Sequence, residues 1–418
     1  MAASTLAVDF GTSNSAAAFL DGAVLRRLEI EPGAETLPTA VFFDARGGGM
    51  RIGSAATRAL IAGEDGRYMR ALKSVLGTAL FHEPRLIGGR RRTLAEVVTA
   101  FIATLKARAE AQAGRAFATV LSGRPVHFHT ADPERDARAE ADLRACYLAA
   151  GFAEVRFLFE PEAAAMASHG IGQPGETALI VDIGGGTSDF TVYRAGSGGL
   201  EILASHGIRL GGTDFDHAVS MSHAMPHLGH GGALRRTFGP GLLPVPNAIY
   251  DDLATWAKIP FLYAPETRRA VADLIRHAVE PAVMARLGTV LDQQLGHELA
   301  FAVEAGKIAA NGGAAARIDM GSIEPGLGAP IDAATLDAAL AGFRGRLREA
   351  MEETLRMAGT PREAITSVVL VGGSSLMAMI ADEAGAVCPG ATLHRSDAFT
   401  AVVDGLALAT SLAPSAAA

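Results

Sequence analysis

Residues 179–190 read LIVDIGGGTSDF, an apolar run with one aspartate that leads into three glycines and then returns to apolar sequence. The first five residues predict a buried strand, and Asp189–Tyr193 predicts the strand that runs back beside it. Glycines between two such strands let backbone N–H groups point into one space, where they can hold phosphate oxygens. The segment therefore predicts a tight turn, Gly184–Ser188, that is a candidate phosphate-binding loop.

The same pattern occurs near the N-terminus. Leu6–Phe10 is apolar, contains Asp9 and ends at Gly11–Ser13, so it closely matches the later segment. In each case a third short strand is predicted after a further turn, at Val24–Ile30 and at Leu200–Leu203. A motif written once in each half of the chain predicts two similar lobes that face each other.

A third glycine turn and several helices complete the pattern. The apolar run Val368–Val371 predicts a buried strand that ends at Gly372–Ser374. Strands that alternate with helices indicate an α/β fold. Apolar spacing, caps and composition predict helices over 94–114, 132–151, 160–170 and 336–359.

Length and composition limit the classes of protein. The chain has 418 residues, 49% hydrophobic and 20% charged, which supplies cores for roughly two or three domains and excludes general disorder. A net charge of −8 argues against broad affinity for nucleic acid or anionic membranes. No apolar run approaches the ~18 residues of a membrane span, and the N-terminus is unlike a signal peptide. With two cysteines and no disulfide framework, we expect a cytoplasmic protein without nucleic-acid or membrane partners.

Acidic residues stand beside the first two turns. Asp9 and Asp182 each lie within two residues of a glycine turn, where bare carboxylates would repel a polyphosphate. They fit a site in which Mg²⁺ and its bound waters lie between the carboxylates and the phosphates. The sequence contains no Walker motif, so this is not a P-loop site.

The three turns resemble the two phosphate motifs and the adenosine motif of the actin-like ATPase superfamily. Two further segments, FEPEAAA at 159–165 and GGTDFD at 211–216, resemble the heat shock protein 70 family within it. The short length and the segment DDLATW at 251–256 are similar to its YegD-type members. The resemblance implies an α/β fold of the duplicated, ribonuclease H-like kind, in which two lobes with inserted subdomains surround a nucleotide cleft.

The resemblance also implies where the lobes lie. Lobe I is expected over residues 1–171, with 39–94 inserted and 395–412 completing it. Lobe II is expected over residues 172–394, with 217–309 inserted. We expect neither the acidic-apolar linker nor the C-terminal peptide-binding domain of the chaperones to follow.

The resemblance carries a role to each matching residue. Mg²⁺ is expected at Asp9 and Asp182 through its waters, and a monovalent cation such as K⁺ at Asp189. Lys73 and Glu160 are expected to place the attacking water, with Asp182 and Thr187 completing the catalytic set. ATP or ADP is expected to bind at Gly11, Thr12, Ser13, Gly184, Gly185, Gly186, Thr187, Gly211, Gly212, Glu304, Lys307, Gly372, Gly373 and Ser374.

Some positions leave alternatives open. Glu160 could instead be an acid that interacts with a helix dipole, and Lys73 could belong to a solvated basic face. Ile308 and Leu376 stand where the family has the arginines that sandwich adenine, and Asn311 replaces a serine. The base would then pack between apolar side chains.

Other features favour structural interpretations. Arg90–Arg92 is interpreted as the charged end of a loop, and Cys146 and Cys388 as inert core thiols. Ile249, Leu253 and Trp256 have helical spacing and predict a buried face. The spacing of four histidines is not a recognised metal-ligand pattern; they are His217, His223, His227 and His230.

Two functions are compatible with these features. The first is an ATP-binding, slowly hydrolysing, chaperone-like protein whose nucleotide state switches lobe closure and a surface for a client or regulatory protein. The alternative is a small-molecule kinase of the sugar or acetate type, because such kinases share the fold.

Overall fold

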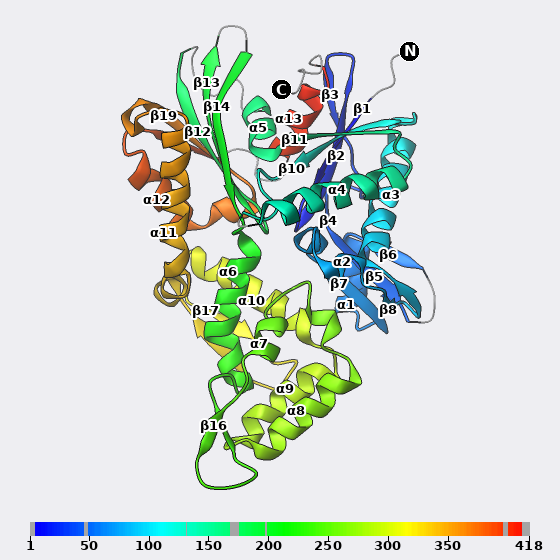
Figure 1. Ribbon diagram of the computed structural model, residues 1–418, viewed down its shortest axis with the longest axis vertical. Coiled ribbons are helices and arrows are strands. Elements are labelled where there is room, and N and C mark those ends of the chain that lie inside the picture. Colours follow the sequence, from blue (N-terminus) through cyan, green and yellow to red (C-terminus); the bar gives the residue numbers. More distant parts are fainter. Residues whose placement is uncertain are drawn as a thin grey trace. The chain divides into compact units, whose positions relative to one another are not determined.

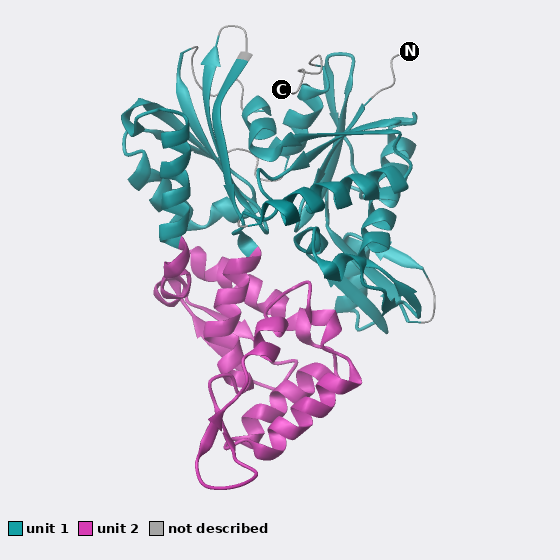
Figure 2. Cartoon of the chain, in the orientation of Figure 1, with its two compact units in different colours: residues 1–212, 344–418 teal, residues 213–343 magenta. Residues whose placement is uncertain are grey.

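The computed structural model describes residues 5–45, 49–130, 132–167, 175–196, 199–395 and 400–411. The chain divides into two compact units, coloured separately in Figure 2: residues 1–212 with 344–418, and residues 213–343. All three glycine turns belong to unit 1, whereas Glu304 and Lys307 belong to unit 2.

The N-terminal sheet of unit 1 is built around strand β1. Its strand order is β11-β10-β1-β2-β3, and β4 also pairs with β2. β1, β2 and β3 are antiparallel neighbours, as the turns between them predict, whereas β10 and β11 run parallel to β1. The strands are β1 (Thr5–Phe10), β2 (Asn14–Asp21), β3 (Val24–Arg27), β4 (Thr36–Pro38), β10 (Thr119–Arg124) and β11 (Glu154–Phe159).

The second sheet of unit 1 has the same arrangement. Its order is β14-β13-β12-β19-β20, again with three consecutive antiparallel strands followed by two parallel ones. The repeat visible in the sequence therefore extends to the order and direction of the strands. They are β12 (Thr177–Ile183), β13 (Ser188–Gly196), β14 (Gly199–Ile208), β19 (Ile365–Val371) and β20 (Thr392–Arg395).

Helices α5 (Glu160–Ala167) and α13 (Ala401–Ala409) lie between the two sheets (Figure 1). They pack on each other, and one cluster of buried side chains joins both helices to β1, β2, β12 and β19. Small residues allow this contact, since a side chain on Gly405 would overlap the carbonyl of Ala163. The two sheets thus share a core.

Two of the outer helices of unit 1 begin at capping residues. Thr93 and Glu96 form a capping box at the start of α3, which ends at Gly114 with φ 65°. The Asp132 carboxylate accepts the N–H of Arg135 at 3.0 Å and caps α4. These helices are α3 (Leu94–Ala113), α4 (Pro133–Ala149), α11 (Ala333–Met357, whose first part belongs to unit 2) and α12 (Ala378–Val387).

The N-terminal half of unit 1 also holds a small sheet, β6-β5-β7, and a hairpin. The expectation that Arg90–Arg92 ends a loop is wrong, because these residues form strand β9 against β8. Gly88 and Gly89, with φ 57° and 73°, make the turn that the hairpin requires. The elements are β5 (Ala40–Asp44), β6 (Met50–Ile52), α1 (Ser54–Ile61), β7 (Gly66–Arg70), η1 (Leu72–Val75), α2 (Ala79–His82), β8 (Arg85–Ile87) and β9 (Arg90–Arg92).

Two other predicted boundaries differ from the structure or fall outside it. The strand expected over Val24–Ile30 is shorter, because the N–H of Ile30 bonds to the carbonyl of Leu28 in a turn. The end of the helix predicted over 160–170 lies outside the described residues.

Unit 2 is mainly helical. The predicted buried face is confirmed at Leu253 and Trp256, which are 1% and 3% exposed, while Ile249 is half-buried. Over the described residues, no helix combines the length and apolar character needed to cross a membrane. The principal elements are α6 (Gly212–Val219), β15 (Ala233–Arg235), β16 (Leu242–Pro244), α7 (Ala248–Leu253), α8 (Pro265–His277), α9 (Pro281–Asp292), α10 (Gly296–Asn311), β17 (Ala316–Asp319) and β18 (Gly328–Ile331).

Candidate functional site

The first two glycine turns touch each other. Gly11–Ser13 joins β1 to β2, and Gly184–Thr187 joins β12 to β13. A Cβ built on Gly185 would lie 2.6 Å from Oγ of Ser13 and 3.0 Å from Cβ of Thr12. A side chain at position 185 would displace Ser13 and Thr12, so glycine suits this approach. The two turns, far apart in sequence, form one glycine-rich surface.

The third turn and Gly211–Gly212 join the same surface. Gly372 follows β19, has φ 82°, and would place a Cβ 2.7 Å from Oδ1 of Asp182. The N–H of Gly212 donates to the carbonyl of Gly184 at 3.0 Å, and a Cβ on Gly212 would meet Oγ of Ser374. All the glycine motifs predicted to hold nucleotide therefore converge within unit 1.

Four carboxylates gather beside these turns. Asp182 and Asp189 are cross-strand partners on β12 and β13 and are 6% and 1% exposed. Burial, followed by repulsion from Glu160, raises the pKa of Asp9 to about 7 and that of Asp189 to about 8. The same two causes raise the pKa of Asp182 well above its usual range. The group is short of positive charge, and oxygen donors of this kind suit Mg²⁺.

Lys73 and Glu160 form a buried ion pair. Lys73 Nζ lies 2.5 Å from Oε1 of Glu160, and the two residues are 7% and 9% exposed. Burial alone would lower the pKa of Lys73, but the attraction of Glu160 and Asp9 outweighs it and raises that pKa. The ammonium therefore stays charged, and its charge is matched by one carboxylate. Lys73 therefore does not lie on a solvated basic face, which was the alternative interpretation of this residue.

A small cavity lies against the first two turns. Its volume is about 20 Å³, which is room for roughly one water molecule. Arg209 contributes to it, although the sequence motifs did not identify this residue. The lining residues are Thr12, Lys73, Ser74, Pro125, Phe128, Gly186, Thr187 and Arg209.

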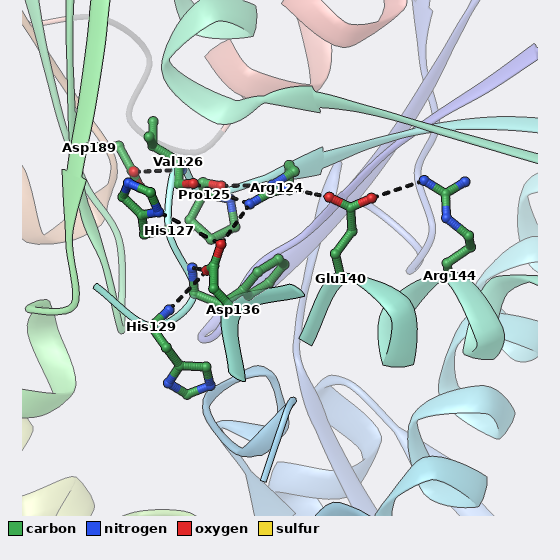
Figure 3. A network of polar contacts seen from close by, with 10 residues as sticks. Arg124, Pro125, Val126, His127, His129, Asp136, Glu140, Arg144 and Asp189 are labelled. Carbon is green, nitrogen blue, oxygen red and sulfur yellow. Dashed lines mark hydrogen bonds and ion pairs between the residues drawn. The ribbon is translucent and has the colours of Figure 1, made fainter. Parts of the chain in front are cut away.

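The loop between β10 and α4 is held on both sides (Figure 3). Oδ1 of Asp189 accepts the N–H of Val126 at 2.7 Å. Oδ1 of Asp136, on α4, accepts the N–H groups of Phe128 and His129 at 2.6 and 3.1 Å. Asp189, expected to bind a monovalent cation, thus also fixes the loop that contributes Phe128 to the cavity. Nothing in the sequence pattern indicated this second contact.

In unit 2, Lys307 forms a buried ion pair of its own. Its Nζ lies 2.6 Å from Oδ1 of Asp216, and the indole Nε1–H of Trp256 donates to Oδ2 at 3.2 Å. Burial raises the pKa of Asp216, and the Lys307 charge opposes that rise. Glu304 lies one helical turn before Lys307 on α10 and is half-buried, while Ile308 is 61% exposed. The predicted ribose pair therefore rests on a carboxylate and an indole that the spacing alone did not reveal.

Other candidate ligands form no direct metal site. Across the described parts of the chain, no three His, Cys, Asp or Glu side chains are grouped to bind an ion directly. The magnesium role expected of Asp9 and Asp182 would act through bound waters, which requires fewer protein ligands. Cys146 and Cys388 are buried, and burial raises both thiol pKa values to about 11.

Part of the chain matches a known protein family. Residues 85–229 match the family model for the Hsp70 protein. The matched region contains Glu160, the turn Gly184–Thr187 and Gly211–Gly212, together with the loop between β10 and α4. The match confirms the predicted fold class, since the actin-like ATPase fold is the fold of that family.

Proposed function

Because this chain belongs to the Hsp70 family, an ATP-binding and chaperone-like family, we propose that its glycine turns hold the phosphates of ATP and that the chain slowly hydrolyses it. One observation supports the proposal most: separate glycine turns meet beside a cluster of buried carboxylates and a buried lysine. Backbone N–H groups at such turns suit phosphate oxygens.

Mg²⁺ fits this cluster. Asp9 and Asp182 would hold its water shell, and the raised pKa values of these acids are consistent with a site that needs a cation. When bound, Mg²⁺ supplies charge neutralisation on the phosphates. We assign K⁺ to Asp189 as a further part of the proposal.

The protein side chains position the reactants. Lys73, which lines the small cavity, and its ion-pair partner Glu160 would orient one water toward the terminal phosphate, while Thr187 would donate its hydroxyl to a phosphate oxygen. Phosphoryl transfer requires positioning and electrostatic stabilisation more than covalent chemistry, which matches this set of groups.

The remaining assignments extend the same proposal. Glu304 and Lys307 would bind the ribose, Gly372–Ser374 would lie under the adenosine, and Ile308 would pack on the base. Nucleotide state would switch the closure of the two lobes, with the boundaries given above, and with it a surface for a client or regulatory protein.

Titration calorimetry of the full chain with ATP and ADP, with and without Mg²⁺, tests the proposal. We expect Mg²⁺-dependent binding that weakens about 10- to 100-fold in Asp9→Asn and Asp182→Asn. Asp65→Asn, which removes an exposed carboxylate of unit 1, is the matched control and should bind as the wild type does.

Two results would contradict the proposal. One is the absence of heat with either nucleotide, and the other is unchanged binding in both aspartate variants. ATP turnover should also be measured alone, with unfolded polypeptide, and with a panel of sugars and acetate. Strong stimulation by one small molecule would replace the chaperone-like assignment with a kinase.

A further inference from the structure

Arg209 is the second cationic side chain at the small cavity, and none of the nucleotide motifs contains it. We propose that the Arg209 guanidinium binds the terminal phosphate of the nucleotide and makes the site selective for the triphosphate over the diphosphate. The inference rests on the proposed function, since it assigns a new residue to the same site.

The backbone around Arg209 is fixed. The residue directly follows β14, and its own N–H donates to Oγ1 of Thr130 at 2.7 Å. The next carbonyl, that of Leu210, accepts the hydroxyl of Ser188 at 2.7 Å, and Leu210 is fully buried. Gly211, two residues after Arg209, packs against Gly186 of the second turn. These contacts fix the backbone of Arg209 at the edge of the glycine-rich surface.

The guanidinium is only lightly engaged. Within the described part of the chain, the guanidinium makes one hydrogen bond, from Nη2 to the carbonyl of Ser74 at 3.5 Å, the long limit for such a contact. Among the residues that the structure describes, no carboxylate forms an ion pair with Arg209. Lys73, the other cation at the cavity, is already matched by Glu160 at 2.5 Å. Arg209 thus brings a positive charge to the cavity that the protein itself does not neutralise.

The chemistry of the cavity indicates what that charge recognises. A guanidinium is always protonated and presents N–H groups in a planar fork that matches two oxygens of a phosphate. Thr12, Lys73 and Thr187 line the same cavity. The proposed function places Thr12 in a phosphate-binding turn, Lys73 beside the attacking water and Thr187 on a phosphate oxygen, so the terminal phosphate would lie near Arg209. That phosphate would otherwise face the carboxylates of Asp9 and Asp182 with no free cationic side chain beside it. ADP lacks the group, so the contact favours ATP.

A structural role makes a different prediction. If Arg209 only closes the surface over the carbonyl of Ser74, its removal changes stability and affects both nucleotides alike. Selectivity between ATP and ADP therefore separates a phosphate contact from a structural contact, and it can be measured without turnover.

The experiment compares dissociation constants of the full chain for Mg²⁺ with ATP, with a non-hydrolysable ATP analogue, and with ADP. Arg209→Ala should weaken ATP and the analogue about 10- to 100-fold and leave ADP within about threefold. Arg209→Lys, which keeps the charge but not the fork, should recover part of the loss. Arg138→Ala, which removes an exposed cation from α4 in the same unit, is the control and should change neither.

Equal losses for ATP and ADP, or no loss for either in a wild type that binds both, would overturn the role of Arg209 and leave the proposed function standing. A wild type that binds neither nucleotide would overturn both. Far-ultraviolet circular dichroism of each variant verifies that it is folded, and the lysine variant tests the inference if the alanine variant is not.

Discussion

Replacing Gly185 by alanine tests whether the two phosphate turns must touch. The added methyl carbon would lie 2.6 Å from Oγ of Ser13 and 3.0 Å from Cβ of Thr12. The Ser13 hydroxyl can rotate away, but Cβ of Thr12 cannot. Favourable contacts between carbon atoms lie at about 3.5–4.0 Å, so the turns must separate by roughly 0.5–1 Å. Overpacking of this kind costs about 1–3 kcal/mol of folding free energy.

The same displacement should also weaken nucleotide binding. A displacement near 1 Å of groups that orient a reactant costs about 100-fold in rate, and both turns carry groups assigned to the phosphates. We therefore expect Gly185→Ala to remain folded, with a lower midpoint of urea unfolding, and to lose at least about tenfold in ATP affinity.

Gly345→Ala is the matched control, because a Cβ at Gly345 on α11 meets open space. Alanine should stabilise that helix by about 0.5–1 kcal/mol and leave nucleotide binding unchanged. Urea unfolding and titration calorimetry are run on both variants. Wild-type ATP affinity in Gly185→Ala would refute the reasoning, since the contact between the turns would then have no part in the site.

Three further changes have defined outcomes. Lys73→Met leaves Glu160 buried without its partner and should lower the free energy of unfolding, measured in urea, by about 3 kcal/mol. The double variant Lys73→Met with Glu160→Gln should lose less. An equal or larger loss of stability in the double variant would contradict a role for the buried ion pair. Trp256→Phe removes a donor to Asp216 and should lower the free energy of unfolding by about 1–2 kcal/mol. Because Trp256 is the single tryptophan, its fluorescence emission in the wild type should change when ADP binds at Lys307. Constant emission at saturating ADP would count against the assignment of Lys307 to the nucleotide. Burial lowers the pKa of His129, so at this residue the folded chain binds fewer protons than the unfolded chain. The stability that neutral His129 contributes is therefore lost as the pH falls below about 6.5. His129→Gln should flatten the decline in unfolding free energy between about pH 7.5 and 5.5, and an unchanged slope would exclude His129 as the source of that decline.

The sequence predicted those parts of the fold that repeat or that depend on local chemistry. The two acid-and-glycine segments are similar enough to indicate related sheets, and β1–β3 and β12–β14 follow from turn residues between apolar runs. The apolar spacing from Leu94 and the cap at Asp132 gave the starts of α3 and α4 correctly. Each of these features is determined by a few residues that are neighbours in the sequence.

Contacts between distant segments could not be predicted in this way. Asp216 and Lys307 are 91 positions apart, and no spacing rule relates them before the fold is known. Arg209 has no motif of its own, since a single arginine after a strand is ordinary surface chemistry. The interpretation of Arg90–Arg92 as a loop end was wrong for a related reason, because only the pairing with β8 shows that this charged run is a strand.

Hydrogen–deuterium exchange of the full chain, with and without saturating Mg²⁺ and ATP, tests most directly whether both turns hold one nucleotide. We predict that amides in peptides covering Gly11–Ser13 and Gly184–Thr187 become protected together, over the same range of ATP concentration. Binding of ATP that protects only one of these segments, or neither, would contradict the account.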